Sequence, residues 1–173
     1  MQIRKDFLSL AVPDITDAER REVMEALDSG WISVGPKVRE FERLFAEYHQ
    51  VKHAIAMSSC TTALFIAAKV LGIGKGDYVI VPTITWQSTA NIVEQLDATP
   101  LFCDVNYDTL NIIPEEAESF IKKFGKKIKA IIPVHHSGLP ADIEKFDQLS
   151  LKYSIPVIYD AAHAVFSSYE NKM

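Results

Sequence analysis

The chain has 173 residues, of which 48% are hydrophobic and 24% are charged, a composition typical of a globular domain that builds its own core. Its formal net charge of −5 argues against nucleic acid or an anionic membrane as the main partner. No segment approaches the ~18 unbroken apolar residues of a membrane span, and the two cysteines form no CxxC pair. We therefore expect a soluble, cytoplasmic protein without a disulfide framework or a zinc site.

The first fifty residues predict two helices. A capping-box pattern begins at Thr16, and Gly30 is placed to end the helix that follows. Pro36 then opens a second helix, because proline is favoured where its missing N–H is not needed. We interpret residues 1–50 as the helical N-terminal segment of a single domain that spans residues 1–173.

From residue 51 to residue 173, short apolar runs alternate with amphipathic stretches. Strands are predicted at 53–57, 78–81, 100–103, 130–132 with Val134, and 157–159, and helices at 59–71, 88–96, 114–124 and 142–153. The strands are continuous apolar runs, which indicates that both faces of the sheet are covered. The pattern predicts a three-layer α/β/α fold with a mostly parallel sheet, whose ligand site lies beyond the carboxyl ends of the strands.

The first group of interest at those ends is the hydroxyl-rich turn that contains Thr61 and Thr62. A helix start offers unpaired N–H groups and a partial positive charge, so it can hold a phosphate. The same turn could equally be an ordinary helix N-cap. It lacks the GxxxxGK[ST] spacing, and no GxGxxG motif occurs in the chain, so neither a nucleoside-triphosphate loop nor a dinucleotide site is predicted.

Two further groups are Trp86 and Asp160, each placed after a predicted strand. An indole in a loop covers either the edge of the core or a flat ligand ring. A carboxylate at a buried strand end needs a backbone N–H cap or a ligand cation. A fourth group, His135 and His136, could bind a metal, but adjacent residues point apart and no carboxylate has ligand spacing, so no metal site is expected.

The three groups together fit one molecule. A helix start for a phosphate, an indole for a flat ring and a carboxylate for a ring cation match pyridoxal 5′-phosphate. Pairing with the carboxylate keeps the ring nitrogen protonated, and the protonated ring is the electron sink for amino-group transfer.

Several motifs, in order along almost the whole chain, resemble one enzyme family. They are WISVGP at 31–36, VREFE at 38–42, SSCTTAL at 58–64, LGIGKGD at 71–77, VPTITW at 81–86, AIIPVH at 130–135 and DAAHA at 160–164. The chain resembles the N-terminal portion of the nucleotide-sugar aminotransferases of the DegT/StrS type, which are fold-type-I pyridoxal-phosphate enzymes. The resemblance implies an incomplete large domain of such a transferase.

Residue by residue, the resemblance implies a set of cofactor contacts. Thr61 and Thr62 contact the phosphate, Trp86 stacks on the ring, Asp160 pairs with the ring nitrogen, and His163 lies beside the cofactor. The family transfers an amino group, usually from glutamate, to a keto carbon of a nucleotide-linked sugar, and its products feed surface polysaccharides.

The resemblance also implies a substrate side and a partner. Trp31, Gly35 and Pro36 would line the sugar side of the pocket. The family works as a dimer with shared active sites, so we expect a homo-oligomer or a complementing chain, with no nucleic acid and no membrane as partners.

The chain departs from the family in one respect. The Schiff-base lysine of the family follows a later strand and a Ser-Phe-His-type motif, and the sequence stops before any such motif. Lys172 precedes the expected position, so no catalytic residue is assigned and we expect residues 1–173 alone to be inactive. Two other readings are a non-catalytic module that binds cofactor or sugar nucleotide, and an α/β domain with a different, hydroxyl- or His-based transferase chemistry.

The same departure affects the predicted sheet. In the fold that the chain resembles, two strands that come last in the sequence separate the first strand from the others. The strand predicted at 53–57 would then lack its neighbours, and exposed strand edges pair with other chains. We expect the chain to self-associate or to rearrange so that residues 53–57 find a new neighbour.

Overall fold

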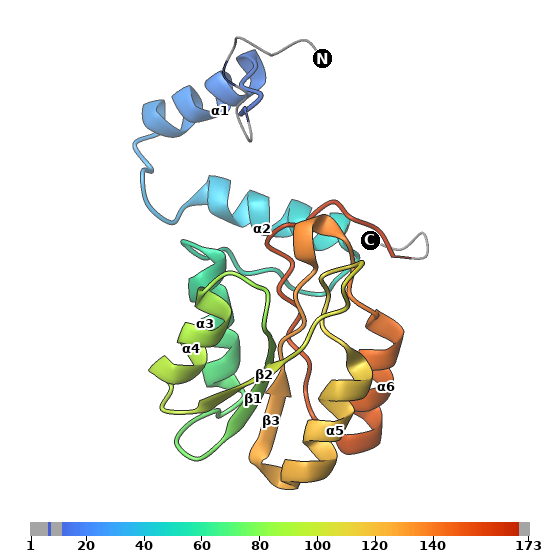
Figure 1. Cartoon of the computed structure of the whole chain (residues 1–173). Helices are drawn as coiled ribbons and strands as arrows, with labels where there is room; N and C mark the ends of the chain where they lie inside the picture. The colour runs from blue at the N-terminus through green and yellow to red at the C-terminus, as the bar shows by residue number, and fades with distance from the viewer. Residues whose placement is uncertain (1–6, 8–11, 170–173) are drawn as a thin grey trace, which may run out of the picture. The chain divides into compact units, whose positions relative to one another are not determined.

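The computed structural model describes Phe7 and residues 12–169 (Figure 1). The chain divides into two compact units, residues 1–56 and residues 57–173. Within the described part of the chain, no helix is both long and apolar enough to cross a membrane.

The first unit contains two helices, α1 (Asp17–Asp28) and α2 (Pro36–Tyr48). The predicted capping box is confirmed, because the Thr16 hydroxyl accepts from Ala18 N at 3.2 Å and the Glu19 carboxylate accepts from Thr16 N at 2.7 Å. Helix α2 begins at Pro36, as predicted, and Gly35 is its N-cap.

The second unit is built on a parallel sheet. Its strands are β1 (Tyr78–Pro82), β2 (Thr99–Cys103) and β3 (Ile128–Ile131), in the order β2-β1-β3. Its helices are α3 (Cys60–Val70), α4 (Ser88–Gln95), α5 (Pro114–Phe124) and α6 (Ile143–Tyr153), with short 3₁₀ turns η1 (Gly125–Lys127) and η2 (His136–Gly138). The predicted alternation of strands and helices over this part of the chain is confirmed.

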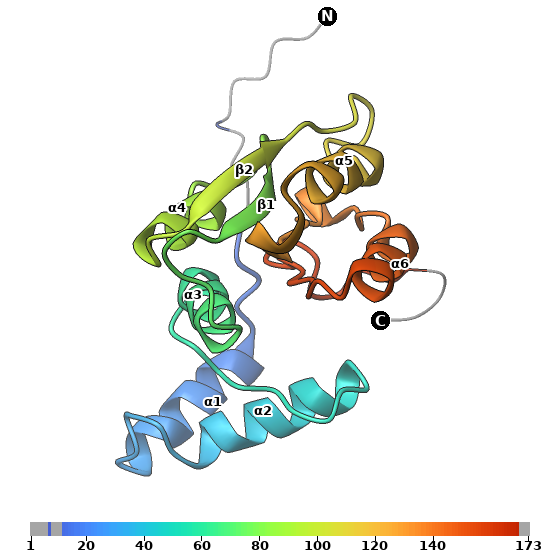
Figure 2. The ribbon, with the colours of Figure 1, turned by 90° about the horizontal axis from the view of Figure 1, so that it is seen from below.

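The helices cover both faces of the sheet, α3 and α4 on one face and α5 and α6 on the other (Figures 1 and 2). Strand β1 is buried between them, and its side chains alternate between the two faces. Val79 and Val81 enter the core beneath α3 and α4, whereas Ile80 enters the core beneath α5 and α6. The predicted three-layer α/β/α arrangement is therefore confirmed, and the continuous apolar runs reflect burial on both faces.

A fourth extended segment lies parallel to β3. It pairs through two isolated bridges, Val157 with Ile131 and Asp160 with Val134. Ile158 N donates to Ile131 O at 2.9 Å. The segment predicted as a strand at 157–159 therefore lies beside β3, but it pairs through isolated bridges and not through a continuous ladder. Among the described residues, its other edge has no strand partner.

The prediction of a strand at 53–57 is wrong. These residues form no strand, and 73% of the Ile55 surface is exposed. A strand is stabilised by its ladder of hydrogen bonds to a neighbour, and the described part of the chain supplies no neighbour to this segment. The chain has therefore not rearranged to give residues 53–57 a new partner, whereas self-association stays a prediction.

Candidate active site

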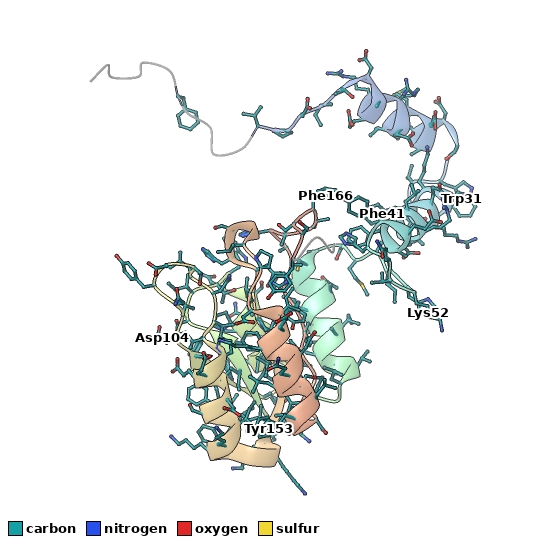
Figure 3. All side chains as sticks on the ribbon, turned by 90° about the vertical axis from the view of Figure 1, so that its right-hand side faces the viewer. Trp31, Phe41, Lys52, Asp104, Tyr153 and Phe166 are labelled. Carbon is teal, nitrogen blue, oxygen red and sulfur yellow. The ribbon has the colours of Figure 1, made fainter. Side chains whose placement is uncertain are left out.

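The candidate site lies at the carboxyl ends of the strands in the second unit. There the start of α3, the first turn of α4 and the turn after Asp160 come together through hydrogen bonds to one carboxylate. Figure 3 shows Phe166, a few residues after Asp160, at the upper end of this unit and Tyr153 at the opposite, lower end. The site is therefore where strand topology predicts it.

Asp160 is the centre of this arrangement, and only 4% of its surface is exposed. Its backbone is fixed to the extension of β3, since Asp160 N donates to Pro133 O at 2.9 Å and His135 N donates to Asp160 O at 3.0 Å. Ala162 N donates to Asp160 Oδ1 at 3.2 Å. The backbone cap weighed as an alternative for Asp160 is thus present, but it serves only one of the two carboxylate oxygens.

The second oxygen is bound by helix α4. The Thr89 hydroxyl donates to Asp160 Oδ2 at 3.2 Å, and Thr85 Oγ1 lies 2.9 Å from Thr89 Oγ1. Thr85 and Thr89 flank Trp86, whose surface is 76% exposed. The alternative that the Trp86 indole packs into the core is therefore wrong, and its exposed ring belongs to the turn that is tied to Asp160.

Helix α3 reaches the same carboxylate through Cys60. Its Sγ lies 3.5 Å from Asp160 Oδ1 and donates to it. Partial burial of the thiol and, after it, the charge of Asp160 raise the pKa of Cys60 to about 11. The thiol is thus a neutral donor at neutral pH, and it joins the start of α3 to Asp160. We call Cys60, Thr85, Thr89 and Asp160 the Asp160 cluster.

The start of α3 gathers several hydroxyls. Ser59 Oγ accepts from Thr62 N at 3.1 Å and lies 3.0 Å from Thr62 Oγ1, and Ser58 Oγ lies 3.3 Å from Thr62 Oγ1. Ser59 is therefore an ordinary N-cap, as one of the two readings of this turn predicted. In an α-helix the first N–H groups have no acceptor within the helix, so those of Cys60 and Thr61 can still bind an anion.

The charges around the Asp160 carboxylate indicate which kind of ligand the site fits. Every donor that the structure places on the Asp160 carboxylate is neutral, and the ion pairs among the described residues do not include Asp160. A buried carboxylate is costly without a cationic partner. The residues present therefore fit a ligand that carries a cation toward Asp160 and an anion toward the start of α3.

The histidine pair stabilises a loop. His135 Nδ1 accepts from Ala141 N at 3.0 Å, and the His135 ring stacks on Tyr159 with 5.3 Å between ring centroids. Burial lowers the pKa of His135, and the charge of Asp160 opposes this effect. His136 N donates to the buried Asn111 side chain at 3.1 Å, so both histidines take part in the packing of the segment after β3.

His163 is exposed in the turn that follows Asp160. A Cβ at Gly138 would lie 3.1 Å from the His163 carbonyl oxygen, and the φ of Gly138 is +86°. Glycine is therefore required where this loop meets the turn. The contact of the His163 side chain with a cofactor stays a prediction.

Trp31, Gly35 and Pro36 belong to the first unit. A Cβ at Gly35 would lie 3.0 Å from Cε3 of the Trp31 ring, so the indole packs against the backbone of this glycine. Trp31 is nevertheless 58% exposed and presents one face to solvent. Their role in binding the sugar stays a prediction.

Sequence reasoning missed three members of the Asp160 cluster, namely Cys60, Thr85 and Thr89. Thr85 precedes the helix that contains Thr89, so helical spacing gave no signal for their contact. No local signal links Cys60 to a residue one hundred positions later.

A comparison with protein families identifies the chain. The model of the DegT/DnrJ/EryC1/StrS aminotransferase family matches residues 13–173. The chain belongs to this family. A curated relative, the spore coat polysaccharide biosynthesis protein SpsC of Bacillus subtilis (strain 168), is 43% identical over all 173 residues of the chain. The chain spans 44% of the length of SpsC.

Solved structures are also similar to the chain. 3-Amino-5-hydroxybenzoic acid synthase is 36% identical, with a TM-score of 0.88 over 94% of this chain and 42% of its own. The PLP form of Spr1654 from Streptococcus pneumoniae is 33% identical, with a TM-score of 0.88 over 95% of this chain and 45% of its own. The fold is thus that of part of a fold-type-I aminotransferase, and aminotransferases of this family bind pyridoxal 5′-phosphate.

Proposed function

We propose that residues 1–173 form the cofactor-binding portion of an aminotransferase that moves an amino group from an amino acid such as glutamate to a keto nucleotide-sugar. The observation that carries this proposal is the buried Asp160 carboxylate, held only by neutral donors at the meeting point of three segments. Membership of the DegT/DnrJ/EryC1/StrS family supports the same reaction class.

In this proposal each residue near Asp160 has a separate task. Asp160 pairs with the protonated ring nitrogen of pyridoxal phosphate, and Trp86 covers the ring face. Thr61 and Thr62 hold the phosphate at the start of α3, and His163 lies beside the ring. The bound cofactor supplies an electron sink, and the anion at Asp160 keeps the ring protonated so that the sink is effective.

The substrate assignment rests on the first unit and on a relative. Trp31, Gly35 and Pro36 are proposed to line the sugar side of the pocket, where the exposed indole offers a flat apolar face. The name of the 43% identical relative SpsC refers to polysaccharide biosynthesis, which supports a sugar as the acceptor.

The proton-moving lysine is proposed to come from sequence beyond residue 173 or from a complementing chain. Residues 1–173 by themselves then bind cofactor but transfer no amino group, because general-base catalysis needs a group within reach of the proton. The working enzyme is proposed to be an oligomer.

Cofactor binding is tested by titrating the chain with pyridoxal phosphate and following the cofactor absorbance. We expect Asp160→Ala to weaken binding by at least about tenfold, because it leaves a ring cation without its partner. Asp108→Asn, in the exposed loop before α5, is the matched control and keeps wild-type affinity. Equal affinity of the wild type and Asp160→Ala would overturn the proposed site.

Catalysis is tested by co-expressing the chain with the lysine-containing remainder of a family member. Glutamate and a keto nucleotide-sugar are then supplied, and the aminated sugar is measured by mass spectrometry. Transfer only in the complemented sample supports the proposal. Cofactor binding without transfer in the complemented sample would instead favour a non-catalytic binding module.

A further inference from the structure

Thr89 is a fully buried polar residue that contacts the carboxylate at the centre of the site. We propose that Thr89, backed by Thr85, is a positioning residue that orients the Asp160 carboxylate toward the ring nitrogen of pyridoxal phosphate. This inference rests on the function proposed above. It assigns to the Thr85 and Thr89 hydroxyls the task of orienting the Asp160 carboxylate before the cofactor binds.

The direction of the hydrogen bonds follows from proton counting. An ionised carboxylate can only accept, so the single hydroxyl proton of Thr89 points to Asp160 Oδ2. Thr89 then has only acceptor capacity left for Thr85, whose hydroxyl lies 2.9 Å away and must be the donor. The chain of donation runs from Thr85 through Thr89 to Asp160, and successive hydrogen bonds of this kind polarise and strengthen one another.

The donors divide between the two carboxylate oxygens. Cys60 and Ala162 donate to Oδ1, whereas Thr89 donates to Oδ2. A carboxylate offers about four lone-pair sites, so these three donors leave acceptor capacity for one further donor. Because Thr89 fixes Oδ2, it determines the direction in which the remaining capacity of that oxygen faces.

The neutrality of the hydroxyl matters as much as its position. A lysine or arginine at this place would cancel the charge of Asp160 and remove the reason for a ring cation to bind. A hydroxyl stabilises the charged carboxylate and leaves its net charge available to the ligand. Thr89 therefore holds the carboxylate in place without competing with the cofactor cation.

The hydroxyl pair also links the acid to the ring-covering turn. Thr89 N donates to Trp86 O at 3.1 Å, and Thr85 directly precedes Trp86. The segment that presents the indole thus also sets the orientation of the Asp160 carboxylate. One short turn thereby aligns the proposed ring-face and ring-nitrogen contacts.

The test compares Thr89→Val, which keeps the shape and removes the hydroxyl, with Thr89→Ser, which keeps the hydroxyl. The first measurement is the affinity of the full chain for pyridoxal phosphate. We expect Thr89→Val to bind about tenfold more weakly, because the Asp160 carboxylate loses the donor that orients it. Thr89→Ser is expected to restore binding.

The second measurement needs no cofactor. In the ¹³C-labelled chain at a fixed pH, the Asp160 carboxyl resonance is expected to shift in Thr89→Val and to keep its wild-type position in Thr89→Ser, because the hydroxyl donates to Oδ2. The other titratable groups facing Asp160 are the Cys60 thiol from α3 and the His135 imidazole after β3. Both are present in every variant, so they do not produce a difference among the variants.

Failure of this inference is distinguishable from failure of the proposed function. Wild-type affinity in Thr89→Val, with Asp160→Ala still weakened, would overturn the inference alone. A loss of affinity that Thr89→Ser shares would show a packing defect and would also overturn it. Should the wild type bind no cofactor, the proposed function fails, and an unchanged carboxyl resonance in Thr89→Val would overturn the inference as well.

Discussion

The acid at the centre of the site acquires its properties from donors on three segments. Cys60 lies at the start of α3, Thr89 lies in the first turn of α4, and Ala162 belongs to the turn after Asp160 itself. Each donor is neutral, so the carboxylate is held in place without being neutralised. A cationic side chain in place of Cys60 or Thr89 would have produced a structural ion pair in place of a ligand site.

The protonation of Cys60 shows how this environment acts on a single side chain. The first residue of a helix usually favours the thiolate. Here burial and the neighbouring Asp160 charge oppose that effect and raise the pKa of Cys60 to about 11. At pH 8 the thiolate fraction is then roughly two orders of magnitude below that of an ordinary cysteine.

Alkylation of Cys60 by iodoacetamide is therefore expected to be slow in the folded chain at pH 8, and to quicken as the pH rises toward 11. Asp160→Asn should accelerate it several-fold, because the charge that opposes the thiolate is removed. Peptide mass spectrometry measures the rate, and the unfolded chain provides the reference. Equal rates in the folded and unfolded chains would contradict the prediction.

Among the elements, helix α6 shows how one amphipathic face joins the core of the second unit. Its N-cap Asp142 accepts from Lys145 N at 3.1 Å, and Ser154 ends it in the left-handed conformation. Leu149 is 8% exposed and lies in the core, whereas Leu151, two residues later, is 84% exposed. One leucine of the helix is therefore buried and the other faces solvent.

Leu149→Ala is expected to lower the free energy of unfolding by about 2–5 kcal/mol, because it leaves a cavity in the core. Leu151→Ala is the matched control, and we expect it to change that free energy by no more than about 0.5 kcal/mol. Urea denaturation followed by circular dichroism measures both values. A similar cost at the two positions would show that α6 does not pack as described.

For the whole molecule, the decisive feature is an incompletely paired sheet. The segment at 157–160 bonds to β3 on one side only, and residues 53–57 have no strand partner among the described residues. Unpaired backbone groups of this kind form a template for pairing with another chain. The chain spans less than half of the length of the relatives that it matches.

The chain is therefore expected to self-associate, with an average mass that rises with concentration in sedimentation experiments. Ile55→Lys should weaken this association, because a charged side chain in an exposed segment disfavours pairing with another chain. Val70→Lys, at an exposed position on α3, should leave it unchanged. A monomer at every concentration would contradict the prediction.

The helices and most of the strands could be predicted from the sequence because their signals are local. The capping box at Thr16, the prolines that open α2 and α5, and the apolar runs of the strands each act within a few residues. The candidate site residues Trp86 and Asp160 could be predicted for the same reason, since each follows a buried strand and strand ends in a parallel sheet lie at one edge.

Which segments pair with each other was decided only by the tertiary structure. The segment at 53–57 has a strand composition but no strand, because a ladder needs a neighbour and no described residue provides one. Likewise, the composition of the chain does not reveal that Cys60 and Thr89 would bond to an acid 100 and 71 positions away. Hydrogen bonds between distant residues depend on how the strands are ordered in space, and that order is a property of the folded chain.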